Sequence, residues 1–234
     1  MKRLRKPGIL ILLLIMATCA GAAEIKYAYK KGSTYSYRYT QSTSSKSKAF
    51  TVSTAESSPP VSYDFSVKSI DFQDGAFILD VGDKAATYRR YIRENGEIKG
   101  APAEAGQGIP FFLTFPEGDW KVAEKRQVRK SLSLGNKDVM AIWSLLLKSV
   151  DNEKGLAEIL FTANLSLPED QLRQKGFSLK GRVVFNMLEG VIHQADWQTT
   201  YKFNFSNKAF AITRNLWVFE KQSSHTLAMT GIQE

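Results

Sequence analysis

The stretch LKGRVVFNMLEGVIHQADWQTTYKFNF, residues 179–205, decides the fold class of this 234-residue chain. Apolar and polar side chains alternate on both sides of Gly190, which is typical of two half-buried antiparallel strands joined by a turn. A two-residue turn would place the apolar sets of the two strands on opposite faces of the sheet. A three-residue loop, 188–190, brings them to one face if its glycine adopts the left-handed conformation.

This hairpin has a predicted register as well as a predicted turn. Phe185 is expected opposite His193, and Gly181 is expected opposite Trp197, where a glycine leaves room for the indole. The other face of the second strand is nearly all polar, so one side of the sheet is predicted to face water. The apolar face of the second strand comprises Val191, His193, Ala195, Trp197, Thr199, Tyr201, Phe203 and Phe205.

Similar alternation, separated by turn signals, covers most of the chain after residue 24. We count about eleven or twelve strands, several of them longer than the usual five or six residues. Such lengths are typical of strongly curved sheets and barrels. The predicted fold is all-β: a single domain of long antiparallel strands, residues 24–234, forming a strongly curved sheet or incomplete barrel with at most one or two short helices.

Four segments interrupt this pattern. Residues 139–150 have apolar residues at helical spacing, but a short loop and a matching strand follow and favour a hairpin over a helix. Residues 168–175 are the best candidate for a short helix, because proline stands at the first position and Gly176 follows the last. Residues 42–60 and 96–110 are expected to be long loops or frayed edge hairpins.

The first 23 residues are predicted to be a secretory signal peptide. A basic start precedes an apolar run, residues 9–17, that is too short to span a bilayer. Small residues follow, so we expect cleavage after Ala22 or Ala23 and a periplasmic or secreted protein. The alternative is a lipoprotein anchored at Cys19, although Thr18 fits poorly before a lipidated cysteine. Membrane contact is expected only in that case.

Cleavage would leave a mildly basic chain without cysteine. Four of the 32 basic residues lie in the leader, so 28 would remain against 23 acidic residues, a net charge near +5 rather than +9. The loss of the only cysteine would exclude disulfides, thiol nucleophiles and thiolate metal sites. Stability must then come from a buried core. Export also argues against nucleic acid as a physiological partner.

The sequence contains no catalytic signature. Its two histidines, His193 and His225, have no second ligand at metal-binding spacing. Pairs of acidic residues such as Asp80 with Asp83 lie at turns, where carboxylates are locally favoured. Phosphate-loop and dinucleotide fingerprints are also missing from the sequence. We therefore expect a non-enzymatic protein that requires no metal and no cofactor.

Aromatic residues on the predicted strands are the candidate ligand-binding residues. A curved sheet that is not backed by helices can leave an apolar concave face open to a small molecule, although such residues more often fill a core. The segment FPEGDW, residues 115–120, is expected to be a turn whose Trp120 folds back on the sheet. The candidate ligand-binding residues are Trp143, Phe185, His193, Trp197, Tyr201 and Phe203.

Two basic clusters, YRRYIR at 88–93 and KVAEKRQVRK at 121–130, are candidate surfaces for an anionic partner. The simpler explanation is a solvated edge strand whose charges prevent pairing with other chains. The residues that would carry the partner surface are Arg89, Arg90, Arg93, Lys125, Arg126 and Arg129.

With its leader, tyrosine-rich first strands, FPEGDW turn and late glycine-punctuated hairpin, the whole chain resembles β-rich proteins exported by bacteria. In architecture it is loosely similar to the periplasmic lipoprotein carriers and their outer-membrane acceptors. That resemblance implies an incomplete β-barrel that shelters acyl chains under a helical lid, and only residues 168–175 could form the lid here. No functional residue is carried across by a matching motif.

Two functional hypotheses follow from the sequence. The first is an exported, non-enzymatic binding protein that holds a lipid-like or other apolar small molecule on a concave sheet face. The second is a cell-envelope interaction module with a filled core, which docks proteins or glycans through its edges and basic loops. A hydrolase ranks last, since no catalytic constellation supports it.

Overall fold

The protein is all-β in the computed structural model, which describes residues 22–49, 52–83, 86–99, 113–134, 137–166, 173–205 and 217–234. Every regular element within these ranges is a strand. The strands are β1 (Ala22–Ala23), β2 (Thr34–Ala49), β3 (Val52–Gln73), β4 (Ala76–Gly82), β5 (Thr87–Arg93), β6 (Ile98–Lys99), β7 (Trp120–Lys121), β8 (Lys125–Leu134), β9 (Lys137–Asp151), β10 (Leu156–Ser166), β11 (Arg173–Asn186), β12 (Val191–Phe205) and β13 (Trp217–Gln233).

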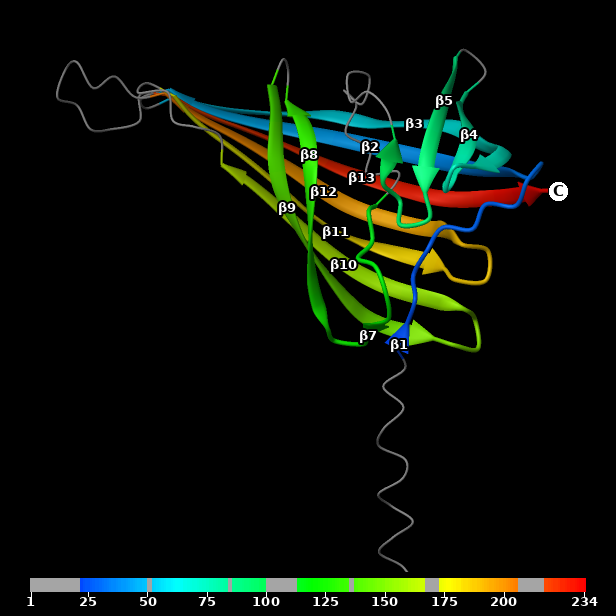
Figure 1. Ribbon diagram of the computed structural model, residues 1–234. Helices are drawn as coiled ribbons and strands as arrows, with labels where there is room; N and C mark the ends of the chain where they lie inside the picture. The colour runs from blue at the N-terminus through cyan, green and yellow to red at the C-terminus, as the bar shows by residue number, and fades with distance from the viewer. Residues whose placement is uncertain are drawn as a thin grey trace, which may run out of the picture.

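Eleven of these strands form one antiparallel sheet in the order β6-β5-β4-β3-β2-β13-β12-β11-β10-β9-β8, and β1 pairs with β7 in a second, two-stranded sheet. In Figure 1 the long central strands converge at one end and fan out towards the other. The strands at both margins, β4 and β5 on one side and β8 and β9 on the other, lie in front of the fan. The predicted fold class is therefore confirmed, as a strongly curved sheet that does not close into a barrel.

The hairpin of β11 and β12 confirms one half of the predicted register and corrects the other. Gly181 lies opposite Trp197, as predicted. Phe185 lies opposite Ile192, because the turn has four residues, 187–190, and a register shift follows it. His193 is the extra residue at this bulge and its side chain is exposed, so the prediction that it faces Phe185 was wrong.

The glycine of that turn behaves as predicted. Gly190 has a φ of 63°, and a Cβ at this position would lie 2.3 Å from the backbone nitrogen of Ala28. The Ala28 amide donates to the Gly190 carbonyl at 3.0 Å. A residue with a side chain would therefore be disfavoured twice, by its backbone conformation and by the close approach of the segment before β2.

The other ambiguous segments also form strands where they are described. Residues 139–150 belong to β9, which pairs with β10 as the predicted hairpin. Residues 42–49 and 52–60 form the far end of the β2–β3 hairpin, in line with the frayed-hairpin alternative. Residues 173–175 begin β11, so a helix over 168–175 was wrong in its last three residues; 167–172 lie outside the described ranges. Of 96–110, only 96–99 are described.

Two segments without long strands, residues 24–33 and 113–119, cover part of the concave side of the sheet (Figure 1). Tyr27, from the first, stacks on Phe115, from the second, at 5.4 Å between ring centroids. Trp120 is 1% exposed, and its indole nitrogen donates to the Glu124 carbonyl at 2.9 Å, so the FPEGDW segment folds back on the sheet as predicted.

The convex side of the sheet is polar. Charged side chains from neighbouring strands form a row across β9, β10, β11 and β12, in which Arg182 bonds Asp196 at 2.9 Å and Lys148 bonds Glu158 at 3.1 Å. This row is the solvated face predicted from the alternation. None of the described residues belongs to a helix long and apolar enough to cross a membrane.

Candidate ligand-binding face

The concave face of the sheet divides into three zones along the strands. The pairing keeps odd-numbered residues opposite one another over most of β2, β10, β11, β12 and β13, so these residues share this face. We define a covered zone beneath the two covering segments, represented by Tyr35, Phe77 and Phe185; a central zone, represented by Tyr39, Trp143, Phe161, Trp197 and His225; and an outer zone, represented by Phe177, Tyr201, Phe203, Phe219 and Lys221.

The covered zone is a filled aromatic core. Phe185 is fully buried and meets Tyr27 edge-on at 5.4 Å and Phe115 at 5.1 Å. Tyr29 meets Tyr35 in the same way at 5.2 Å. Edge-to-face contacts of this kind stabilise a core beyond the burial of their area. Burial raises the pKa of Tyr27 well above its ordinary value, so its hydroxyl stays neutral and bonds the Leu113 backbone. These rings pack directly against one another.

The central zone is a buried aromatic layer built around Gly181. Trp197 is 3% exposed and Trp143 is 4% exposed. A Cβ on Gly181 would lie 2.5 Å from Trp197 Cβ and 2.6 Å from Phe161 Cζ. A glycine is therefore what allows the two rings to approach across β11, as the sequence predicted.

His225 lies at the centre of a hydrogen-bonded cluster in this zone. Its Nδ1 is 2.6 Å from the Tyr39 hydroxyl and its Nε2 is 3.2 Å from Thr199 Oγ1, while the Trp197 ring stacks on it at 5.0 Å. The Tyr39 hydroxyl donates to Gln41 Oε1 at 3.1 Å. That arrangement makes Nδ1–H the donor to Tyr39 and leaves Nε2 to accept from Thr199, so a neutral imidazole satisfies every partner.

Burial shifts the ionisation of this cluster towards neutral forms. Desolvation lowers the pKa of His225 to about 4 and raises the pKa of Tyr39 to about 12. Neither group is poised to exchange a proton near neutral pH. The cluster therefore has the character of a satisfied buried network rather than of a catalytic dyad.

The outer zone carries aromatic rings that remain partly exposed. Tyr201 lies opposite Phe177, and Phe203 lies opposite Phe219. All four side chains keep part of their surface in solvent, unlike the rings of the other two zones. Apolar surface of this kind on a concave face is typical of ligand-binding or interaction sites.

The structure distributes the predicted ligand-binding residues over all three zones. Phe185 lies in the covered zone, Trp143 and Trp197 lie in the central zone, and Tyr201 and Phe203 lie in the outer zone. His193 lies outside the concave face, on the bulge of β12. The sequence argument missed the partly exposed Phe177 and Phe219 and the buried His225. Each of them lies opposite a predicted candidate on the neighbouring strand, and alternation within one strand does not give that pairing.

The predicted anionic-partner residues do not form one surface. Arg89, Arg90 and Arg93 belong to β5, and Lys125, Arg126 and Arg129 belong to β8, at opposite margins of the sheet. Several are already paired: Arg89 with Asp80, Arg93 with Glu97 and Arg126 with Glu124, each at 2.8 Å. Arg126 also donates to the Glu117 carbonyl at 2.9 Å and to that of Asp119, and so fixes the FPEGDW turn.

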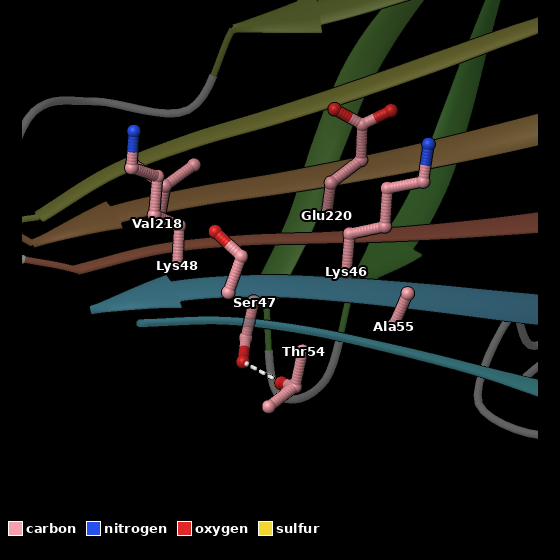
Figure 2. Close-up of a pocket in the computed structure, with 8 residues that line it drawn as sticks. Lys46, Ser47, Lys48, Thr54, Ala55, Val218 and Glu220 are labelled. Carbon is pink, nitrogen blue, oxygen red and sulfur yellow. Dashed lines mark hydrogen bonds between the residues drawn. The ribbon is translucent and has the colours of Figure 1, made fainter. Parts of the chain in front are cut away.

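One shallow hollow lies at the level of the outer zone, next to Phe219 along β2, β3 and β13. It has a volume of about 300 Å³ and is open to solvent. Figure 2 shows Lys46, Lys48 and Glu220 on the opposite side of the strands from Ser47 and Thr54, so the hollow wraps around the margin of the sheet rather than entering a core. Because it is shallow and open to solvent, the hollow does not enclose a small molecule. Among the described residues no cluster of three metal-ligating side chains occurs.

Comparison with known proteins gives a likeness of fold alone. No family model and no curated protein sequence matches the chain. A solved structure described as lipid-protein interactions in lipovitellin superimposes with a TM-score of 0.52 and 11% sequence identity. The match covers 88% of this chain but only 26% of that chain, so this protein corresponds to about a quarter of the length of its structural neighbour.

Proposed function

We propose that this protein is an exported, non-enzymatic binding protein that holds a lipid-like or other apolar ligand on the outer zone of its concave face. The observation that carries the proposal is the row of partly exposed aromatic side chains, Phe177, Tyr201, Phe203 and Phe219, on a concave surface whose other two zones are buried. Removing such rings from water is favourable by roughly 25 cal/mol per Å² of apolar surface. A flexible apolar ligand lying along the strands would supply that contact.

Two further observations support this function. The structural neighbour is described by its interactions with lipid, and it shares a large curved β-sheet with this chain. The amino-terminal residues have the pattern of an export leader, which would deliver the protein to a compartment bounded by membranes. In this proposal the leader is removed after Ala22 or Ala23, a cleavage that also removes one or both residues of β1. Retention and lipidation of Cys19 would instead tether the same sheet to a membrane.

The first experiment is a mass measurement on protein taken from the envelope of its own host, under native and then denaturing conditions. We expect extra mass in the native spectrum that disappears on denaturation, which identifies a bound molecule. The mass after denaturation should be that of a chain that begins at Ala23 or Glu24. A denatured mass equal to that of a chain that begins at Cys19 and carries acyl chains would mean that the protein is a tethered lipoprotein and not a free carrier. Identical native and denatured masses would count against ligand binding.

A pair of variants tests the site itself. Phe203→Ser removes a partly exposed ring from the outer zone and should abolish retention of the extra mass while the protein stays folded. Ile142→Ser is the matched control, because Ile142 is 48% exposed and its neighbour Trp143 faces the concave side. The control should retain the ligand. Equal retention by both variants would exclude the outer zone as the binding site.

Docking of envelope proteins or glycans through the basic clusters is the less favoured function. The six predicted cations lie at two opposite margins of the sheet, and Arg89, Arg93 and Arg126 form ion pairs. This distribution suits the protection of edge strands from pairing with other chains.

A further inference from the structure

The outer zone is amphipathic across its strands. Its aromatic residues come from β11, β12 and β13, whereas the neighbouring part of β2 contributes Thr43, Ser45 and Ser47 to the same face. Thr43 bonds Ser223 at 3.0 Å and Ser47 bonds Thr54 at 2.7 Å, so hydroxyl groups line one side of the aromatic patch. One face therefore offers an apolar half and a hydrogen-bonding half side by side.

Lys221 stands on the boundary between these halves. On one side it lies opposite Tyr201 of β12, and on the other side it lies opposite Ser45 of β2. Its side chain is exposed, and no carboxylate of the described residues lies within ion-pairing distance of it. Lys221 therefore carries its charge on the concave face beside Tyr201, without a carboxylate partner among the described residues.

Lys221 is the cation of this face among the outer-zone side chains that the structure describes; Lys175 lies opposite Phe203 in register. Glu220 and Lys202 are the neighbours of Lys221 on the adjacent positions of β13 and β12, and they pair with each other at 3.2 Å on the convex side. The closest acidic residue in register on the concave side is Glu56, which lies opposite Ser45 and therefore two strands away, roughly 10 Å. An anion placed at Lys221 would face the ammonium group of this lysine and the hydroxyl groups of the neighbouring β2 residues.

We propose that the ligand is a single-chain amphiphile with an anionic headgroup, that Lys221 binds the headgroup, and that the alkyl chain lies over Phe203 and Phe219. This inference rests on the proposed function and adds the class of ligand. Lys221 lies four positions after the first residue of β13, a span of about 13 Å along the strand, which a dodecyl chain covers. The headgroup would then contact the hydrogen-bonding half of the face, while the alkyl chain contacts the aromatic half.

The test compares three probes with one chain length: laurate, dodecyl phosphate and the uncharged dodecanol. We expect the unsubstituted protein to bind the two anions about fivefold more tightly than the alcohol, measured by displacement of a fluorescent probe. Lys221→Gln should remove that preference and leave dodecanol binding unchanged. Lys202→Gln is the matched control, because it removes one positive charge from the opposite face of the same region. It should keep the preference.

The outcomes separate the two proposals. If none of the probes binds, the proposed function fails. If all three bind equally to the unsubstituted protein, or if Lys221→Gln keeps the preference for anions, ligand binding stands and the headgroup assignment is wrong. Binding to anionic phospholipid vesicles with no binding of the three monomeric probes would overturn the single amphiphile in favour of a membrane surface. Equal losses in the Lys202→Gln control would show a general charge effect instead of a site.

Discussion

The two ends of strand β12 follow the same alternation but have different surroundings. Near the turn that joins β11 to β12, Ala195 and Trp197 are 1% and 3% exposed. Farther along the same face, Tyr201 and Phe203 keep part of their surface in solvent. The pattern of side chains therefore determines which face of the strand turns inward, while the segments packed on that face determine how much of it is buried.

At the end of the sheet nearest this turn, two covering segments bury the concave face. Residues 24–33 are tied to the turns and margins of the sheet, since the Tyr27 amide donates to the Glu94 carbonyl at 2.7 Å. The Phe115 amide donates to the Asn95 carbonyl at 2.7 Å and fixes the second segment beside the first. These bonds hold Tyr27 and Phe115 over Phe185. In the proposed function, a bound ligand would bury the rings of the outer zone in the same way.

The largest expected effect comes from replacing the same kind of side chain in these two regions. Trp197→Ser should lower the free energy of unfolding by about 3 to 5 kcal/mol, because it empties a buried site. Phe203→Ser should cost about 1 kcal/mol, since that ring already keeps part of its surface in water. Urea denaturation followed by tryptophan fluorescence and circular dichroism measures both. Equal losses would mean that the outer zone is as much a part of the core as the central zone.

A smaller effect is expected from adding one methyl group to β11. Gly181→Ala places a Cβ 2.5 Å from Trp197 Cβ and 2.6 Å from the Asp196 carbonyl oxygen, and we expect it to cost about 1 to 3 kcal/mol. Gly176→Ala, on the same strand, meets no atom within 4 Å. It should be neutral or slightly stabilising, because alanine loses less backbone entropy on folding than glycine. Thermal denaturation of the two variants gives the comparison, and a destabilised Gly176→Ala would contradict it.

The sequence predicted the fold class because alternation and turn residues are local signals. The pairing of Gly181 with Trp197 and the left-handed Gly190 both belong to one hairpin of consecutive strands. The same reasoning assigned residues 139–150 to a strand, since a hairpin partner follows directly. Contacts within one hairpin are accessible to pattern analysis for this reason.

Other features of the site depend on contacts that a single strand pattern does not contain. The sequence argument missed the bulge at His193. One inserted residue there moves the residues between the turn and the bulge to the opposite faces of the sheet. Trp197 and Phe203 had the same predicted role, and only the packing on the concave face separates them. His225 and Lys221 gain their surroundings from β2 and β12, and β2 lies more than 170 residues earlier in the chain. The adjacent apolar pair Val191 and Ile192 was the only local signal of the bulge.

The smallest expected effect is a dependence of stability on pH that belongs to the central zone alone. Burial lowers the pKa of His225 in the folded protein to about 4, below the ordinary value of 6.5. Between these two values the unfolded chain binds a proton that the folded protein does not, so the free energy of unfolding falls as the pH falls from about 6.5 towards 4. The stability that this group contributes is fully present above 6.5. Because hydroxyl groups of Tyr39 and Thr199 adjoin the ring, we expect a loss on the order of 1 kcal/mol.

Two histidines in different surroundings make this prediction decisive. His225→Gln should remove the stability that the neutral imidazole contributes. The free energies of unfolding of this variant and of the unsubstituted protein should therefore converge as the pH falls from 7 towards 4. His193→Gln is the matched control, because the His193 side chain is exposed on the bulge and lies outside the central zone. Urea denaturation at several pH values measures all three curves. A His225→Gln curve that stays parallel to that of the unsubstituted protein would mean that the imidazole is not held neutral by burial, and that the central zone is open to water in the way the outer zone is.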